Sequence, residues 1–276
     1  MSVLAGVNRV LLVHAHPDDE TLSSGRLIAA LVGIGVSCLL VTCTRGERGA
    51  VMPGVLPPNT GSDELVKRRD LELTAASSIL GVLGRAYLGE PPFRAPGIPA
   101  TRYEDSGMVW VRPGLAGPPP DAGPASLSRG DLVEQAADLA AGMHAWRPQL
   151  VVSYDESGGY GHPDHLRARE IARLACRETG VPFAELVSPE SSEGRGSGEG
   201  QGSGDGARSG DDGIEWVPGQ EDSAVIARTV GALACYRTQL AVRGDERRTW
   251  LEHVGGQRQD LPGPVGLRLV PPEGLS

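Results

Sequence analysis

Four of the six histidines in this chain fall in two short clusters that also carry carboxylates. Residues 14–20 read H-A-H-P-D-D-E, and residues 161–165 read G-H-P-D-H. Two imidazoles and one carboxylate that leave a coordination position open suit catalytic zinc or a similar divalent metal. Because such a metal lowers the pKa of a bound water toward neutrality, the clusters predict metal-assisted hydrolysis.

The spacing within the clusters indicates how the work is divided. His16 and Asp19 lie three residues apart, and His165 would complete a facial set of ligands from the second cluster. Asp18 and Asp19 cannot both point at one metal without strain, so one is a ligand and the other faces the metal-bound water as general base. His162, one helical turn before His165, is placed to donate to a developing oxyanion.

Each of these residues also has a purely structural interpretation. The acidic run 18–20 could form an ordinary helix N-terminus, and Tyr154 could simply end a strand. We interpret His14 as a core or supporting residue rather than a ligand, and His144 and His253 as surface residues. The occurrence of both clusters in one chain favours the catalytic interpretation.

Both clusters follow apolar runs, residues 10–13 and 149–155, that are typical of fully buried strands. Helical patterns follow them at residues 20–32 and 163–179. In an open α/β sheet, ligands bind at the carboxyl ends of the parallel strands, so the clusters would meet at that edge. The sequence therefore predicts an α/β fold with a Rossmann-like, mostly parallel sheet flanked by helices and a metal site at its carboxyl edge.

The remaining pattern completes this sheet and divides the chain. We expect strands at 36–44, 86–88 and 181–187, helices at 63–80, 131–146 and 223–240, a long functional loop or lid at 90–126, and a short apolar run at 265–270. Residues 1–187 would form the catalytic domain. The low-complexity segment 188–213 has no large apolar residue, so we expect it to be disordered. Residues 214–276 would supply a C-terminal helix and tail that pack on the same domain.

Composition restricts the class of protein. A net charge of -9 over 276 residues argues against a nucleic-acid partner, which would need a basic surface. No apolar run approaches a membrane span, and the N-terminus carries no signal pattern. The four cysteines lack C-x-x-C spacing and are expected to be free thiols. We expect a cytoplasmic protein without nucleic-acid or membrane partners; its oligomeric state is not predicted.

The motifs resemble those of the LmbE/PIG-L family of zinc-dependent N-acetylglucosaminyl deacetylases. The resemblance is carried by the two histidine clusters and extends over residues 8–178. Within that family, the chain is most similar to the branch that acts in mycothiol biosynthesis. That similarity rests on V-T-C-T-R-G-E, R-R-D-L-E-L, D-S-G-M and Y-D-E-S-G-G-Y-G-H-P-D-H.

The resemblance implies a role for each residue of the catalytic centre. His16, Asp19 and His165 would bind one Zn²⁺ per subunit, with Fe²⁺ as an alternative. Asp18 would be the general base and then the acid that protonates the leaving amine, in an attack by metal-bound hydroxide on the acetamide carbon. The oxyanion and the surrounding shell involve further residues: His162 and Tyr160 as oxyanion stabilisers, Asp164 and His14 as supporting residues, Arg69 and Asp105 on sugar hydroxyls, and Glu47 in the pocket wall.

The same resemblance implies a small amino-sugar substrate, N-acetylglucosaminyl-inositol. Residues 21–24 lack the Lys that the related mycothiol S-conjugate amidases carry, and Gly161 precedes His162. Both features favour the deacetylase. The C-terminal third departs from the family pattern, which keeps open an S-conjugate amidase or a deacetylase of another acetamido-sugar conjugate. From other classes, a metal-dependent phosphoesterase would need more acidic ligands, and a non-catalytic sugar-binding module would not need both Asp18 and His162.

Overall fold

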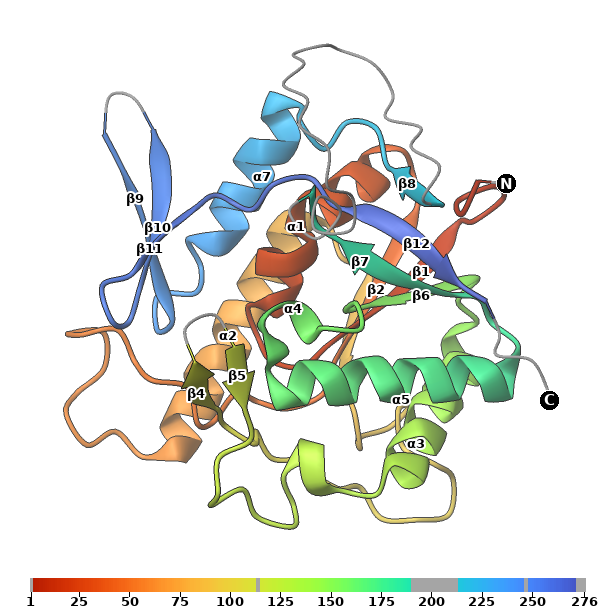
Figure 1. Ribbon diagram of the computed structural model, residues 1–276, viewed down its shortest axis with the longest axis horizontal. Coiled ribbons are helices and arrows are strands. Elements are labelled where there is room, and N and C mark those ends of the chain that lie inside the picture. Colours follow the sequence, from red (N-terminus) through yellow and green to blue (C-terminus); the bar gives the residue numbers. More distant parts are fainter. Residues whose placement is uncertain (1, 113–114, 190–212, 246–247, 272–276) are drawn as a thin grey trace.

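The computed structural model describes residues 2–112, 115–189, 213–245 and 248–271. Its centre is a seven-stranded sheet with the order β3-β2-β1-β6-β7-β12-β8 (Figure 1). The strands are β1 (Arg9–His14), β2 (Ser37–Thr42), β3 (Gly84–Tyr87), β6 (Leu150–Ser153), β7 (Phe183–Val187), β8 (Ile214–Trp216) and β12 (Gly266–Val270). The first five pair in parallel, and β12 pairs antiparallel with both β7 and β8. The predicted α/β fold with a mostly parallel sheet is confirmed.

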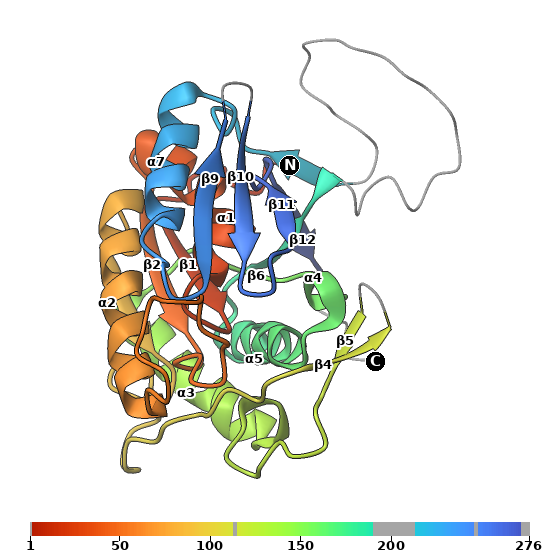
Figure 2. The same ribbon diagram turned by 90° about the vertical axis from the view of Figure 1, so that its left-hand side faces the viewer.

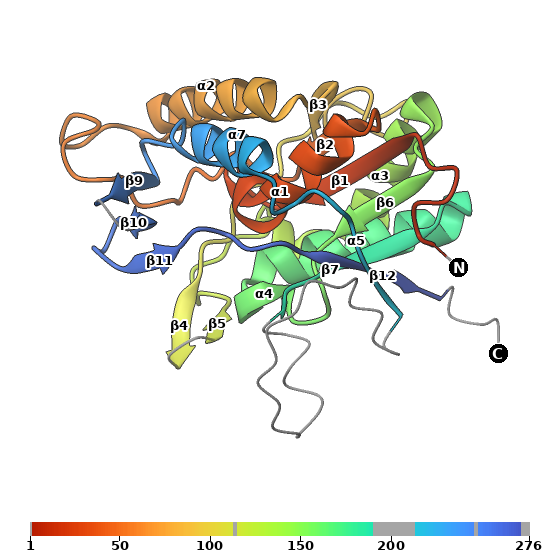
Figure 3. The same cartoon turned by 90° about the horizontal axis from the view of Figure 1, so that it is seen from above.

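Successive residues of β1 pack against two different helix layers. Val10 and Leu12 belong to the core beneath one layer, and Leu11 and Val13 belong to the core beneath the other. This follows from the two-residue period of a strand, and it explains why both sides of β1 are apolar. Figure 3 shows the two layers on opposite sides of the sheet. The layers consist of α1 (Asp19–Gly33), α2 (Ser62–Leu80) and α7 (Ser223–Leu233) on one side, and of α3 (Leu132–Trp146) and α5 (Pro163–Thr179) on the other.

The C-terminal helix is shorter than predicted. The expectation of a helix over 223–240 is wrong, because α7 ends at Leu233 and a strand begins at Leu240. The amide of Tyr236 bonds the carbonyl of Leu233, which tightens the last turn, and the Tyr236 ring then turns into the core with none of its surface exposed. Burial of this large side chain overrides the helical pattern of the local sequence.

Two small sheets were not predicted. The chain after α7 forms an antiparallel sheet of β9 (Leu240–Gly244), β10 (Thr249–His253) and β11 (Arg258–Asp260), which Figure 2 shows beside α7. Part of the segment 90–126, predicted to be a long loop or lid, forms the antiparallel pair β4 (Val109–Arg112) and β5 (Leu115–Gly117). The pair lies next to the short helix α4 (Gly158–Gly161) in Figure 2, and a lid role for it stays a prediction.

The C-terminal segments join the central sheet and helices. Strands β8 and β12 extend the sheet beyond β7, and α7 packs against α1 and α2. The division of the chain into residues 1–187, 188–213 and 214–276 stays a prediction, and the expected disorder falls largely on residues 190–212, which lie outside the described residues. Among the described segments, no helix combines the length and the apolar character needed to cross a membrane.

Helix α3 packs closely on the segment before β4, which gives a test of the fold. A Cβ atom added at Gly142 would lie 2.0 Å from Cδ1 of the buried Phe93 ring. Because the ring must shift, we expect Gly142→Ala to lower the free energy of unfolding by about 1–3 kcal/mol, measured by urea denaturation. Gly33→Ala is the control, since nothing lies within 4 Å of its added Cβ. Equal stability of the two variants would contradict this packing.

Candidate metal centre and active site

His16 lies in the turn that follows β1, with a carboxylate at each ring nitrogen. Its Nδ1 is 3.1 Å from Oδ2 of Asp19, and its Nε2 is 3.1 Å from Oδ2 of Asp164. Asp164 is itself held by the amide and hydroxyl groups of Ser106. A carboxylate on the far nitrogen is the arrangement that orients metal-ligating histidines, so it leaves Nδ1 facing Asp19 as the candidate donor.

Nε2 of His165 faces the carboxylate of Asp19. The Nδ1–H of His165 donates to the carbonyl of Gly158 at 3.1 Å, which places the lone pair of the neutral ring on Nε2. That Nε2 is buried, lies 3.3 Å from Oδ2 of Asp19, and has no hydrogen-bond partner among the described residues. A buried acceptor without a donor is costly, and a metal ion would satisfy it.

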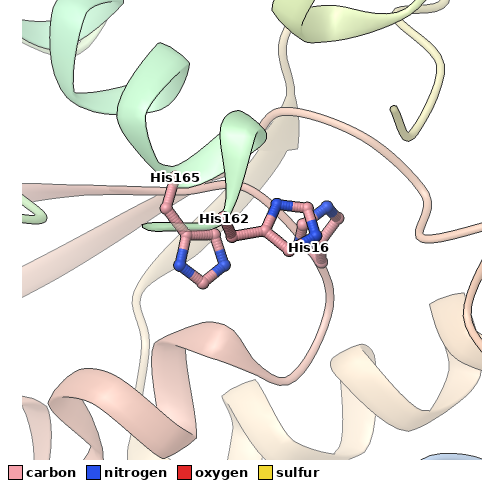
Figure 4. Close-up of side chains that lie close together, drawn as sticks. All are labelled: His16, His162 and His165. Atoms are coloured by element: carbon pink, nitrogen blue, oxygen red, sulfur yellow. The ribbon is translucent and has the colours of Figure 1, made fainter. Parts of the chain in front are cut away.

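Two of the predicted ligands, His16 and His165, therefore face the same carboxylate oxygen of the third, Asp19. Oδ2 of Asp19 faces Nδ1 of His16 and Nε2 of His165, and the donor set of two imidazoles and one carboxylate suits a divalent metal. His162 lies close by, because one ligand atom from each of the three histidines lies within 4.8 Å of the others (Figure 4). The residues present thus fit a metal ion, and the assignment of His16, Asp19 and His165 as its ligands stays a prediction.

Charges at this point are tightly paired. Although burial opposes it, contact with the imidazoles of His165 and His16 holds the pKa of Asp19 well below its usual range. Burial also acts to lower the pKa of His16, but Asp105, Asp164 and Asp19 hold that pKa well above its usual range. A cation bound at Nδ1 of His16 would replace a proton there, so metal and protons compete for this nitrogen.

Asp18 has a strained backbone at the start of α1. Its φ of 104° lies in the left-handed region, which residues other than glycine rarely adopt and which is found mainly at functional sites. Oδ2 of Asp18 accepts a hydrogen bond from Nη2 of Arg69 at 3.1 Å, and the amide of Asp18 donates to Glu20. Burial raises the pKa of Asp18 to about 8, with Arg69 opposing the shift and the Asp19 carboxylate adding to it. Asp18 does not pair with either histidine ligand.

His162 sits at the N-terminus of α5 with one nitrogen already used. Its Nδ1 accepts the backbone N–H of Asp164 at 3.1 Å, so the neutral ring carries its proton on Nε2. Burial, together with the charges of His16 and His165, lowers the pKa of His162 to about 3. A neutral imidazole that donates from Nε2 is suited to polarise an oxygen atom. Tyr160 lies beside it, with ring centroids 5.9 Å apart, on the exposed turn of α4.

The residues predicted to bind sugar lie on the His16 side of the site. Oδ1 of Asp105 is 3.6 Å from Nε2 of His16, and the amide of Asp105 donates to Oε1 of Glu47. Oε2 of Glu47 has no hydrogen-bond partner among the described residues. Arg69 is buried, and its guanidinium donates to the carbonyls of Gly46 and Pro17 as well as to Asp18. All three side chains thus lie around the site, and their roles toward substrate stay predictions.

The sequence interpretation missed Tyr154. Its hydroxyl donates to Oδ2 of Asp19 at 2.8 Å, accepts the amide of Ala15, and its ring stacks on His165 at 4.2 Å between centroids. The available signal was its position at the carboxyl end of β6, the strand that leads to the second cluster. His14 packs edge-on against Tyr154, with its Nε2 3.0 Å from the hydroxyl of Ser24, and burial lowers its pKa to about 4.

Comparison with known proteins identifies the family. The PIG-L family, described as GlcNAc-PI de-N-acetylase, matches residues 11–176. The chain belongs to the PIG-L family. This confirms the resemblance drawn from the two histidine clusters.

Curated relatives of this PIG-L chain carry one name. A "1D-myo-inositol 2-acetamido-2-deoxy-alpha-D-glucopyranoside deacetylase" of Kribbella flavida is 44% identical over 170 residues, which are 61% of this chain and 53% of that protein. A protein of the same name from Actinosynnema mirum is 35% identical over 280 residues, covering 96% of this chain and 90% of its own length. The match thus spans about half the length of the first relative and most of the second.

Solved structures support the fold. The zinc inhibited form of teicoplanin deacetylase Orf2 aligns with a TM-score of 0.56 at 22% identity, covering 95% of this chain and 98% of that one. N,N'-diacetylchitobiose deacetylase from Pyrococcus horikoshii aligns with a TM-score of 0.55 at 16% identity, covering 98% and 86%. At these identities the likeness concerns the fold alone.

The carboxylate behind His16 gives a test of the metal centre. We expect Asp164→Asn to weaken Zn²⁺ affinity by about 10–100-fold, because His16 loses the partner that orients it. The measurement is competition with a chromophoric chelator. Asp138→Asn is the matched control. Asp138 lies on α3, is equally buried, and accepts hydrogen bonds from Arg94 and Tyr103. If both variants bind Zn²⁺ as the native protein does, the assigned role of Asp164 is wrong.

Proposed function

We propose that this protein is a zinc-dependent N-deacetylase that hydrolyses the acetamide of an N-acetylglucosaminide. The observation that carries the proposal is that His16 and His165 both face Oδ2 of Asp19, with His162 grouped with these two histidines and a separate carboxylate, Asp18, next to Asp19 in the chain. Ligands, base and oxyanion donor are the parts that amide hydrolysis requires. The names of the curated relatives support the same reaction.

The cation would be held by His16, Asp19 and His165. When bound, it supplies Lewis acidity to a water molecule and to the acetamide oxygen. Two imidazoles and a carboxylate suit Zn²⁺ and also Fe²⁺, and Zn²⁺ is proposed because it favours the four-coordinate geometry that three protein ligands and one open position provide.

Asp18 performs the proton transfers in this proposal. The pKa of Asp18, near 8 through burial, would fall beside a dication, which leaves the carboxylate ionised and able to take a proton from the attacking water. The same carboxyl then returns that proton to the leaving amine, so free amine and acetic acid, which ionises to acetate, are released. Arg69 and the Asp18 backbone hold the carboxylate in place throughout.

His162 stabilises the charge that develops on the acetamide oxygen. Its Nδ1 is occupied by the amide of Asp164, so the Nε2–H is the donor available to that oxygen. Tyr160, on the neighbouring turn, would supply its hydroxyl as a second donor to the acetamide oxygen. Its phenol is protonated at neutral pH and can therefore donate.

The proposed substrate is N-acetylglucosaminyl-inositol of mycothiol biosynthesis, as the name of the relatives suggests. Asp105 and Glu47, with Arg69, would contact the sugar hydroxyls on the His16 side. The second candidates are an S-conjugate amidase and a deacetylase of another acetamido-sugar conjugate. Against a non-catalytic sugar-binding module stands the presence of both Asp18 and His162, which such a module would not need.

The role of Asp18 can be tested by acetate release from N-acetylglucosaminyl-inositol with the Zn²⁺-loaded protein. We expect Asp18→Asn to lower kcat by about 10²–10⁴-fold, because the amide cannot accept the proton of water. Asp63→Asn, at the exposed start of α2, is the control and should keep the native rate. A variant at Asp18 that retains native kcat would exclude it as the base.

Substrate choice separates the candidates. The same Zn²⁺-loaded protein is assayed on N-acetylglucosaminyl-inositol, a mycothiol S-conjugate and N,N'-diacetylchitobiose, and kcat/KM is compared. We expect a preference of more than about tenfold for the inositol glycoside, a difference of about 1.4 kcal/mol in transition-state binding. A reversed order would move the assignment to the amidase or to another acetamido sugar.

A further inference from the structure

The turn between α7 and β9, residues 234–239, contacts α1 and α2 beside Asp18. The hydroxyl of Tyr236 donates to Oε1 of Glu20, and neither side chain has exposed surface. The other oxygen of that carboxylate, Oε2, accepts the backbone N–H of Asp18 at 3.1 Å. A chain of two hydrogen bonds therefore links the C-terminal part of the protein to the backbone of the proposed base.

The same turn contacts the helix that holds the Asp18 side chain. The amide and hydroxyl of Thr238 donate to the two carboxylate oxygens of Glu72, at 3.0 and 2.6 Å. Glu72 lies one helical turn after Arg69 on α2, and Nη2 of Arg69 donates to Oδ2 of Asp18 and to the carbonyl of Pro17. Thr238 thus fixes the position of α2 at the level of Arg69.

Asp18 needs such support because its backbone is strained. A non-glycine residue at a φ of 104° keeps that conformation only where the surrounding contacts impose it. Here the backbone contact comes from Glu20 and the side-chain contact comes from Arg69. Each of these two residues lies on an element that the 234–239 turn contacts directly, through Tyr236 or Thr238.

We propose that Tyr236 and Thr238 are positioning residues for Asp18, acting through Glu20 and through α2 respectively. Both lie beyond residues 11–176, the part of the chain that the family model matches. The C-terminal third would therefore contribute to catalysis without touching substrate. This inference rests on the proposed function, in which Asp18 is the general base.

The test compares kcat and KM for N-acetylglucosaminyl-inositol in the native protein, Tyr236→Phe and Thr238→Val, together with Zn²⁺ content and melting temperature. We expect each variant to lower kcat on the order of tenfold, since small displacements of a catalytic group are costly, with KM within about twofold and Zn²⁺ content unchanged. If Tyr236→Phe does not fold, Thr238→Val carries the test.

Tyr103→Phe is the matched control. Tyr103 is also a buried tyrosine that donates to a buried carboxylate, that of Asp138, at 2.8 Å. It should lower the melting temperature to a similar degree and leave kcat within about twofold of native. If the Tyr236 and Thr238 variants behave like this control, their roles are structural only and the inference is overturned.

A double-mutant cycle shows whether Tyr236 acts through Glu20. We expect the effects of Tyr236→Phe and Glu20→Ala on kcat to be non-additive, because Tyr236 is proposed to act on Asp18 through the Glu20 carboxylate. Additive effects would overturn this route. A native protein that deacetylates none of the three substrates defeats the proposed function and this inference with it, whereas native turnover with unaltered variants defeats the inference alone.

Discussion

The carboxylate of Asp19 is the point on which the structure of the site depends. A single oxygen, Oδ2, contacts the imidazoles of His16 and His165, the hydroxyl of Tyr154 and the amide of His16. The two histidine clusters are about 150 residues apart in sequence, and they meet at this oxygen because β1 and β6 are adjacent parallel strands. These partners compensate a buried charge that would be costly without them.

Burial next to that carboxylate explains the division of labour among the other titratable groups. Asp18 and Asp19 are neighbours in sequence, yet burial raises the pKa of Asp18, whereas hydrogen bonds and charge from His165 and His16 overcome burial and hold the pKa of Asp19 low. Asp18 has a positive φ, and its Oδ2 accepts a hydrogen bond from Arg69. Groups whose environments move their pKa values apart are those that can serve as ligand and base within one site.

Much of this arrangement followed from local sequence. The apolar run before His16 and the run before Tyr154 predicted buried strands, and both strands form. Helix α7 was predicted to extend to residue 240. It ends at Leu233, because the Tyr236 ring is buried against a distant part of the chain. Periodicity describes each segment against an average core, so it cannot show which residue will find a specific partner elsewhere.

The sequence by itself determined the fold class, the family and the set of polar residues at the carboxyl edge of the sheet, because strand periodicity and the two clusters are local patterns. Only the tertiary structure decided which nitrogen of each histidine faces Asp19, that Arg69 contacts Asp18, and that Tyr154 and Tyr236 support the site. These are contacts between residues far apart in the chain, and their geometry depends on how the layers pack. The motifs identified the reacting side chains, and tertiary packing determined how those side chains are oriented.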